Sequence, residues 1–240
     1  MESLAAAPRF DRRVVLPECR MSPSAAFRLD ASSSVKLDAA PVVLIVDDDP
    51  AARESLEMQL GSAGWRTESF ACAMEFLARL RTAGPACLVL DVSLPDINGL
   101  DLLQRLADQG SLLPVIMVSA HNDVPTTVRA MKGGAIDFIT KPFEEAVVLA
   151  AVALGIERSR AALQKESEMR VLQDRYTALT RREQEVMQRV VVGRLNKQVA
   201  WELDISEITV KAHRGKVMRE MKIRSLPDLV KIAAKLGIGA

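Results

Sequence analysis

From residue 41 onward, short apolar runs alternate with amphipathic segments of helical periodicity, and this pattern most constrains the fold. The apolar runs predict five strands, at 42–46, 65–70, 86–91, 114–118 and 136–139. The segments that follow them predict five helices, at 50–62, 72–82, 99–108, 124–132 and 143–160. Such strand–helix units in succession indicate an α/β fold, a doubly wound five-stranded parallel sheet with helices on both faces.

Acidic residues stand at the ends of two of these strands. Asp91 closes the third predicted strand, and Asp47, Asp48 and Asp49 follow the first. Because the carboxyl ends of parallel strands meet at one edge of a sheet, we expect these carboxylates to lie close together. Clustered carboxylates repel one another unless a hard cation such as Mg²⁺ neutralises them. A strand-end aspartate alone is more often a helix cap, and Asp49, followed by Pro50, is typical of one.

Beyond the last of these helices the pattern is wholly helical. Residues 157–178 contain neither Pro nor Gly, so the helix begun at 143 should continue into a charged linker. Four further helices are predicted at 181–192, 197–203, 207–221 and 226–236. Thr180 with Glu183 forms a capping box, and Asn196 and Ser206 are the predicted caps of the next two helices. The second and third of these helices, joined by a short turn, predict a helix-turn-helix.

The helical unit needs a core of its own. Apolar residues at helical spacing are expected to fill it: Val186, Val190, Val199, Leu203, Ile205, Ile208, Val210, Val217 and Met221.

The patterns divide the chain into four parts. These are a flexible extension (1–40), an α/β domain (41–156), a helical linker (157–177) and an all-α domain (178–240). Charge follows the same division, since acidic residues outnumber basic ones 16 to 10 over 41–160 and basic residues outnumber acidic ones 16 to 10 over 161–240. A basic terminal module is typical of proteins that bind nucleic acid.

Cysteine usage and hydropathy indicate a cytoplasmic protein without a membrane partner. The three cysteines, Cys19, Cys72 and Cys87, show no disulfide, zinc or redox spacing. No apolar run approaches the length of a bilayer span, and residues 1–40 lack the apolar core of a signal peptide.

Further motifs accompany the acidic cluster. They are Val46-Asp47-Asp48-Asp49, the Asp91 strand end with Pro95 and Gly99, Val118-Ser119-Ala120, and Lys141-Pro142-Phe143. In this order and spacing, over about 110 residues, they resemble the receiver domain of two-component response regulators, which has a flavodoxin-like fold. The segments 121–125, 130–132 and 134–138 resemble its FixJ-type subgroup.

This resemblance implies a phosphoacceptor site. In such receivers a sensor histidine kinase donates a phosphoryl group to the aspartate that matches Asp91, which acts as the nucleophile. It also implies that Asp48 and Asp91 ligate Mg²⁺, with Asp47 acting through water and the main-chain carbonyl of Ser93 as a further ligand. Ser93 is smaller than the residue expected at this position in FixJ-like relatives.

The same resemblance assigns roles at the neighbouring strand ends. Lys141 would pair with the phosphoryl oxygens, and Ser119 would hydrogen-bond one of them. Phe138 stands at the position of the family's switch aromatic, and the Lys141–Pro142 peptide at that of its cis bond. Taken singly, Lys141 would be a solvated surface charge and Ser119 an unremarkable serine, and Phe138 fits a plain core phenylalanine equally well.

The acidic cluster also allows an enzymatic interpretation. A phosphatase that uses two acids separated by one residue after its first strand, with a Thr or Val nearby, would show a different pattern from Asp47-Asp48-Asp49-Pro50. The presence of Asp91, Ser119 and Lys141 in one pattern therefore favours the phosphoacceptor.

The C-terminal segments resemble the LuxR-type DNA-binding domain. The matching runs are 179–186, 196–200 and 205–214, and the resemblance covers residues 178–237. It implies that helix 207–221 enters the major groove. The residues expected to face DNA are Thr209, Lys211, Ala212 and Gly215, with His213, Arg214 and Lys216 available to phosphates or bases. The alternative is that these cations form an ordinary solvated helix face.

Together the two halves predict a transcription factor of the FixJ/NarL response-regulator family that is controlled by phosphorylation and is not an enzyme. Its expected partners are a sensor histidine kinase, promoter DNA, RNA polymerase and, once phosphorylated, a second copy of itself. The alternative is a scaffold protein whose receiver acts without phosphorylation. The complete set of Asp47, Asp48, Asp91, Ser119 and Lys141 disfavours it.

Overall fold

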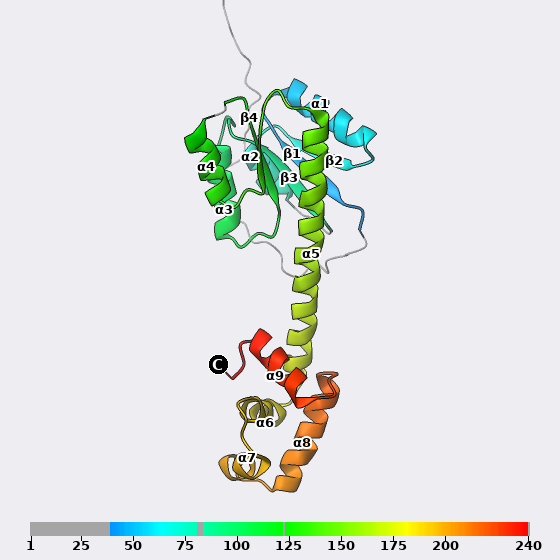
Figure 1. The fold of residues 1–240 in the computed structure, drawn as a ribbon, viewed down its shortest axis with the longest axis vertical. Coiled ribbons are helices and arrows are strands. Elements are labelled where there is room, and N and C mark those ends of the chain that lie inside the picture. The colour runs from blue at the N-terminus through cyan, green and yellow to red at the C-terminus, as the bar shows by residue number, and fades with distance from the viewer. Residues whose placement is uncertain (1–38, 81–83, 122, 240) are drawn as a thin grey trace, which may run out of the picture.

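A computed structural model describes residues 39–239 except 81–83 and 122. The predicted extension over 1–40 lies outside the described residues apart from its last two positions, and Cys19 lies outside them too. Two folded units are joined by one long helix (Figure 1). Among the helices that the structure describes, none combines the length and hydrophobicity of a membrane span.

The first unit contains the predicted parallel sheet. Its strands are β1 (Val42–Val46), β2 (Arg66–Phe70), β3 (Ala86–Asp91), β4 (Val115–Ser119) and β5 (Asp137–Thr140). They lie in the order β2-β1-β3-β4-β5, and every pairing is parallel. The expected bounds are confirmed to within one residue. Because β3 lies in the middle of the sheet, all six of its residues are buried.

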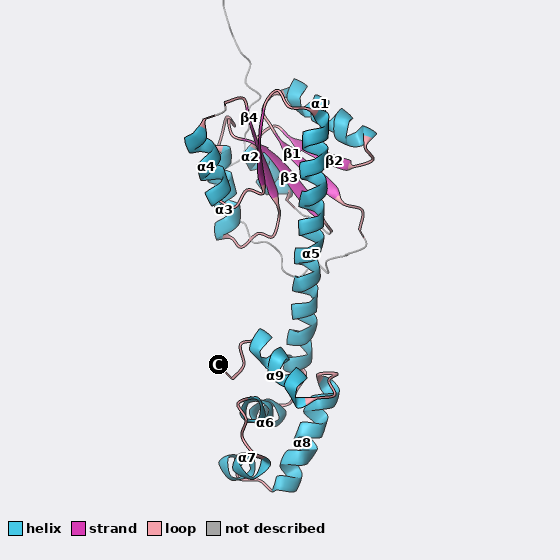
Figure 2. Cartoon of the chain, in the orientation of Figure 1, coloured by secondary structure: helices cyan, strands magenta, loops and turns pink. Residues whose placement is uncertain are grey.

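Helices cover both faces of the sheet (Figure 2). Val43 and Ile45 of β1 pack in one apolar cluster with α1 (Pro50–Ser62) and α5 (Glu145–Thr177). The alternate residues of β1 pack in a second cluster with α2 (Ala73–Arg79), α3 (Gly99–Asp108) and α4 (Val124–Lys132). The period of two along the strand therefore divides one apolar run between two cores.

The second helix is shorter than predicted. Helix 72–82 was expected, but α2 ends at Arg79, and positions 81 and 82 of the expected helix lie outside the described residues. Leu80 takes an extended conformation, with φ −60° and ψ 97°, and its side chain packs against the core that α2 covers. Burial of this leucine therefore outweighs continuation of the helix.

The fifth helix is anchored to the sheet and then leaves it. It begins at Glu145 and continues without a break for 33 residues to Thr177. Gly155 allows a close approach to β3, because a Cβ atom there would lie 2.4 Å from Sγ of Cys87. Burial raises the pKa of the Cys87 thiol to about 12, so this side chain packs as a small neutral group. One turn on, Oγ of Ser159 accepts a hydrogen bond from the N–H of Ala86 at 3.1 Å.

The second unit is a small helical domain at the far end of α5 (Figure 1). It consists of α6 (Arg181–Val191), α7 (Asn196–Leu203), α8 (Glu207–Glu220) and α9 (Leu226–Lys235) around one apolar core. Thr180 and Glu183 form the predicted capping box, and Ser206 accepts from the N–H of Thr209 as a cap. Arg182 donates a hydrogen bond to the carbonyl of Leu203, which links α6 to the end of α7.

Two predictions for this domain were wrong. Asn196 does not cap α7; it is the first residue of that helix, and its Oδ1 accepts a hydrogen bond from Arg214 at 2.6 Å. Ile208, expected in the core, is 80% exposed. It stands two positions before the buried Val210, which places it on nearly the opposite side of the helix.

Candidate functional site

Asp91 lies at the end of the central strand and is held by the loop that follows. It is only 4% exposed, and its Oδ2 accepts a hydrogen bond from the N–H of Ser93 at 2.5 Å. The loop then returns against the strand, where the N–H of Gly99 donates to the carbonyl of Val92. A Cβ atom at Gly99 would lie 2.1 Å from the carbonyl oxygen of Asp91. Glycine is therefore required for this close approach.

Asp47 reaches the same edge of the sheet from β1. It is fully buried, and its Oδ1 accepts a hydrogen bond from the N–H of Asp49 at 3.1 Å. Its main-chain carbonyl accepts from Nη1 of Arg53 at 2.7 Å. Asp49 is the helix cap that was predicted, since its side chain accepts from the N–H of Ala51. Asp48 is exposed, and within the described residues its side chain makes no hydrogen bond or ion pair.

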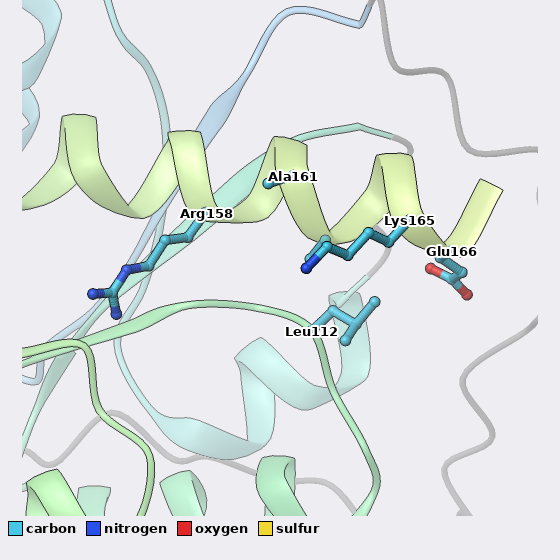
Figure 3. Close-up of a pocket in the computed structure, with 6 residues that line it drawn as sticks. Leu112, Arg158, Ala161, Lys165 and Glu166 are labelled. Atoms are coloured by element: carbon cyan, nitrogen blue, oxygen red, sulfur yellow. The ribbon is translucent and has the colours of Figure 1, made fainter. Parts of the chain in front are cut away.

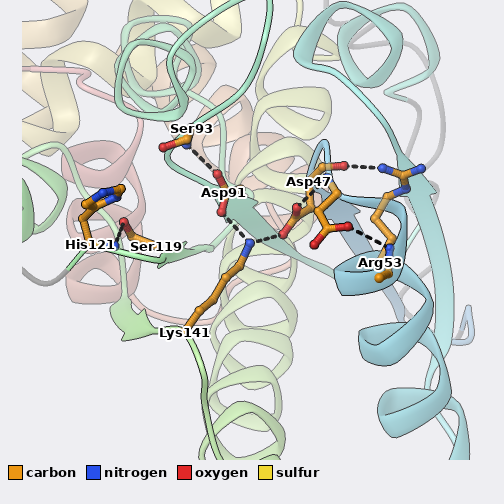
Figure 4. Close-up of polar contacts among 9 residues, drawn as sticks. Asp47, Arg53, Asp91, Ser93, Ser119, His121 and Lys141 are labelled. Carbon is orange, nitrogen blue, oxygen red and sulfur yellow. Dashed lines mark hydrogen bonds and ion pairs between the residues drawn. The ribbon is translucent and has the colours of Figure 1, made fainter. Parts of the chain in front are cut away.

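Lys141 joins the two buried carboxylates. Its Nζ lies 2.5 Å from Oδ2 of Asp47 and 2.7 Å from Oδ1 of Asp91 (Figure 4). The lysine follows β5, and the Lys141–Pro142 peptide is cis, as the family resemblance implied. Its main-chain N–H donates to the carbonyl of Ser119 at 2.7 Å, which fixes the end of β5 to the end of β4. Three separate strands therefore deliver one cation and two acids to one point.

Burial and charge oppose each other in this cluster. Burial raises the pKa of Asp91 above its ordinary value, although the hydrogen bond and charge of Lys141 act to lower it. Burial also acts to lower the pKa of Lys141. The hydrogen bonds to Asp47 and Asp91 outweigh that effect and hold the pKa of Lys141 above its ordinary value. The site thus keeps a cation firmly charged beside an acid that is costly to ionise.

Ser119 and Phe138 lie beside this cluster. Ser119 ends β4, is 2% exposed, and accepts a hydrogen bond through Oγ from the N–H of His121 at 3.1 Å. Within the described part of the chain, no hydrogen bond joins its side chain to Asp91 or Lys141. Phe138 is half-buried and packs against the core beneath α2, α3 and α4. Ser119 lies on β4, which pairs with the strand of Asp91, and Phe138 lies on β5, one strand further out.

Two residues that support the site were not anticipated. Arg53 holds the carbonyl of Asp47 from the first turn of α1. Asp96, in the loop after Asp91, accepts hydrogen bonds from the N–H groups of Ala73 and Met74 and so ties this loop to the start of α2. Because the partners of Asp96 lie more than twenty residues away along the chain, no local pattern signals this contact.

The acids at this edge offer oxygen donors to a metal ion. Among the described residues, no group of three His, Cys, Asp or Glu side chains is already arranged to hold a metal ion. Asp47 and Asp91 are instead bridged by Lys141, and Asp48 remains exposed. The donors available are nevertheless all oxygens, the type that a hard cation such as Mg²⁺ prefers. The residues therefore fit this ion by their chemistry.

A pocket of about 520 Å³ lies away from this cluster (Figure 3). It is lined by Leu112, which precedes β4, and by residues of α5 that include Arg158 and Lys165. Because it adjoins the start of β4, it lies at the sheet edge opposite Asp91. It takes no part in the acidic site.

The predicted DNA-facing residues divide into an exposed and a half-buried group. Lys211, Ala212, Gly215 and Lys216 are exposed on α8. The other three are half-buried. Thr209 bonds to Ser206 and Arg214 bonds to Asn196, whereas Nδ1 of His213 is buried without a hydrogen-bond partner in the described chain. In the exposed group, Lys216 pairs with Glu183, with Nζ 3.9 Å from Oε1, whereas Lys211 makes no ion pair with the described residues.

Comparison with known proteins agrees with both halves of the chain. Residues 43–153 match the family of response regulator receiver domains, and residues 177–233 match the luxR family of bacterial regulatory proteins. The response regulator TodT of Pseudomonas putida is 41% identical over 199 residues, which cover 83% of this chain and 88% of that protein. The transcriptional regulatory protein FixJ of Rhizobium meliloti is 40% identical over 197 residues, covering 82% and 97%.

A solved structure shows the same arrangement of elements. The response regulator StyR is 42% identical and superposes with a TM-score of 0.73, over 82% of this chain and all of that one. A receiver implies a histidine kinase as partner, and a helix-turn-helix of this type implies DNA binding. Proteins with both are transcription regulators rather than enzymes. The chain therefore belongs to the two-component response regulators, with a receiver domain and a LuxR-type DNA-binding domain.

Proposed function

We propose that Asp91 accepts a phosphoryl group from a histidine kinase and that this modification controls DNA binding by the helical domain. The observation that supports it is the cluster at the sheet edge, where Lys141 lies between the buried Asp91 and Asp47. In the transfer, an oxygen of Asp91 forms a bond to phosphorus as the P–N bond of the phosphohistidine breaks, and the imidazole leaves with a proton from solvent. Lys141 is placed to pair with the phosphoryl oxygens.

We assign Mg²⁺ to the same edge, since receivers typically use this ion for phosphorylation. Asp47, Asp48, Asp91 and the carbonyl of Ser93 would hold it. When bound, Mg²⁺ offsets the negative charge shared by the acids and the incoming phosphoryl group. The protein's own contribution is to bury Asp47 and Asp91 at fixed positions, through Arg53 and the loop after β3.

The signal would pass from Asp91 to β4 and then to β5. Ser119 would turn from the N–H of His121 to a phosphoryl oxygen, and Phe138 would rotate inward into the space released. The side of the receiver formed by α4, β5 and α5 would then change. That side already exposes apolar residues, among them Val124 (75%), Met131 (47%) and Leu154 (44%). We assign it to a phosphorylation-dependent homodimer.

The helical domain would bind promoter DNA through α8. Lys211 and Lys216 supply exposed cations, and Thr209, Ala212, His213, Arg214 and Gly215 complete the proposed contact set. In a dimer, binding of one domain to a DNA half-site raises the effective concentration of the second domain at the adjacent half-site. RNA polymerase is the partner expected at the promoter. Response regulators are generally cytoplasmic, and the same location is proposed for this one.

Phosphate-affinity electrophoresis tests the central step. The full-length protein would be incubated with acetyl phosphate and Mg²⁺, alongside the variants Asp91→Asn and Asp108→Asn. Asp108 is an exposed acid at the end of α3 and serves as the matched control. A shifted band is expected for the wild type and for Asp108→Asn and not for Asp91→Asn. Unshifted bands for all three proteins would contradict phosphorylation of Asp91 and favour the scaffold alternative.

A further inference from the structure

One face of α8 is unusually poor in hydrogen-bonding groups. Lys211 and Ala212 lie three and four residues after Ile208, and Gly215 lies four and three residues after them, so the four share a side of the helix. All four are exposed, whereas Val210 and Val217 are buried in the core of the domain. Of the four side chains, Lys211 alone carries a hydrogen-bond donor.

Thr209 and Arg214, two polar residues of α8 that were expected to face DNA, are tied to the protein. Oγ1 of Thr209 lies 2.8 Å from Oγ of Ser206, within the cap of the helix. Nη1 of Arg214 donates to Oδ1 of Asn196 at 2.6 Å. Lys216, one turn after Ala212, is exposed but pairs with Glu183, with Nζ 3.9 Å from Oε1. Of the two exposed lysines of α8, Lys211 is therefore the one that makes no ion pair with the described residues.

Ile208 is the largest apolar group on this face. It is 80% exposed and lies in the first turn of α8, the part of a recognition helix that usually meets base edges. An isolated exposed apolar residue is ordinary on a protein surface. Here, however, it lies one turn from Ala212 and next to an exposed lysine in a domain of basic character.

We propose that Ile208 is a specificity-determining residue that contacts the 5-methyl group of a thymine in the major groove. Thymine is the base that presents an apolar group there, so an isoleucine can distinguish it without a hydrogen bond. Lys211, beside it, would bind the acceptor edge of a guanine or a phosphate. This inference rests on the proposed DNA binding by α8, and it adds which base a residue of α8 contacts.

The test uses DNA that the protein itself selects. Fragments retained by the phosphorylated full-length protein from a random pool would define a target, and each thymine would then be replaced singly by deoxyuridine, which lacks the methyl group. Wild-type protein is expected to lose about three- to fivefold in affinity at one position of each half-site, from the loss of one buried methyl contact. Fluorescence anisotropy would measure each dissociation constant.

The variant Ile208→Ala decides whether this residue causes the effect. It should bind the thymine and deoxyuridine fragments equally, because the contact is absent in both. Val230→Ala, at a half-exposed position on α9, should keep the wild-type difference. Since Ile208 is exposed, its variant is expected to fold, and the melting curve of the helical domain would verify this.

The outcomes separate this inference from the proposed function. If the wild type selects DNA but no thymine methyl matters, or if Ile208→Ala keeps the thymine preference, Ile208 does not read the base and DNA binding still stands. If Ile208→Ala binds every fragment like the wild type yet fails to support transcription, the residue contacts a protein partner and the inference is overturned. If the wild type selects no DNA at all, both are overturned.

Discussion

Lys141 and Asp91, fifty residues apart in the chain, form an ion pair in which Nζ lies 2.7 Å from Oδ1. The same Nζ lies 2.5 Å from Oδ2 of Asp47, so one ammonium serves two buried carboxylates. This arrangement neutralises part of the charge of the acidic cluster. A lysine suits that task because its compact charge can turn from a carboxylate to another anion.

Removal of the lysine charge should make the fold depend on divalent cations. In Lys141→Met, Asp47 and Asp91 face each other without the ammonium, and breaking a buried ion pair costs about 3 kcal/mol in the free energy of unfolding. We expect a lower melting temperature in the presence of EDTA, measured by circular dichroism. Added Mg²⁺ should recover part of this loss and should stabilise the variant more than the wild type.

Lys132→Met is the control, because Lys132 is exposed at the end of α4. It should melt close to the wild type and respond to Mg²⁺ to the same extent as the wild type. Equal responses of Lys141→Met and the wild type would show that the cation and the lysine do not act on the same acids.

Asp91→Asn should raise stability at neutral pH. Burial raises the pKa of Asp91 above its ordinary value of 3.8, so folding favours the neutral carboxyl over the ionised one. The stability that this group contributes is complete below its unfolded pKa and is lost as the pH rises through the folded pKa. Asparagine imitates the neutral form at every pH. The variant should therefore melt above the wild type at pH 7, and the difference should vanish as the pH falls below about 4.

Asp123 provides a comparison of opposite sign. Hydrogen bonds from Thr126, first from its N–H, lower the pKa of Asp123, which caps α4. Asp123→Ala should therefore melt below the wild type at neutral pH, with a difference that shrinks in acid. Melting temperatures of both variants from pH 3 to pH 8 would check the two trends together. An Asp91→Asn protein that melts below the wild type at pH 7 would contradict the prediction.

Lys211→Ala should weaken DNA binding at low salt and reduce its salt dependence. Lys211 is exposed on α8, and a cation that contacts a phosphate releases about one counterion. The slope of log K against log salt concentration should fall by about 1, as measured by anisotropy from 50 to 200 mM salt. Lys235→Ala, at an exposed position on α9, should leave the slope unchanged. An unchanged slope in Lys211→Ala would remove this residue from the contact set.

Local patterns were sufficient for most of the fold. The strands follow from apolar runs with a buried centre, and caps such as Asp49 and Ser206 follow from hydrogen bonds within one turn. The errors arose where a distant partner decides the conformation. Asn196 bonds to Arg214, eighteen residues further along, instead of capping its own helix. Leu80 leaves α2 because the core on that face of the sheet takes its side chain.

The sequence predicted those parts of the site that the order of the strands brings together. Asp47, Asp91 and Lys141 follow strands whose ends meet at one edge, so their contact follows once the strands are known. Arg53 and Asp96 support the same edge through contacts that depend on the paths of loops, which no periodicity encodes. Ile208 was misplaced because an apolar residue near the start of a helix was assumed to face the core.

Gly99→Ala should disturb both stability and phosphorylation, because the new methyl group would lie 2.1 Å from the carbonyl oxygen of Asp91. The loop must move, at about 1–3 kcal/mol in the free energy of unfolding, and the N–H of Ser93 would no longer hold the carboxylate in place. Gly61→Ala is the matched control: it lies in α1 with no atom within 4 Å of the new Cβ and should gain up to about 1 kcal/mol. Urea unfolding and the rate of labelling by acetyl phosphate would measure the two effects. If Gly99→Ala were as stable and as rapidly phosphorylated as the wild type, the loop would not position Asp91.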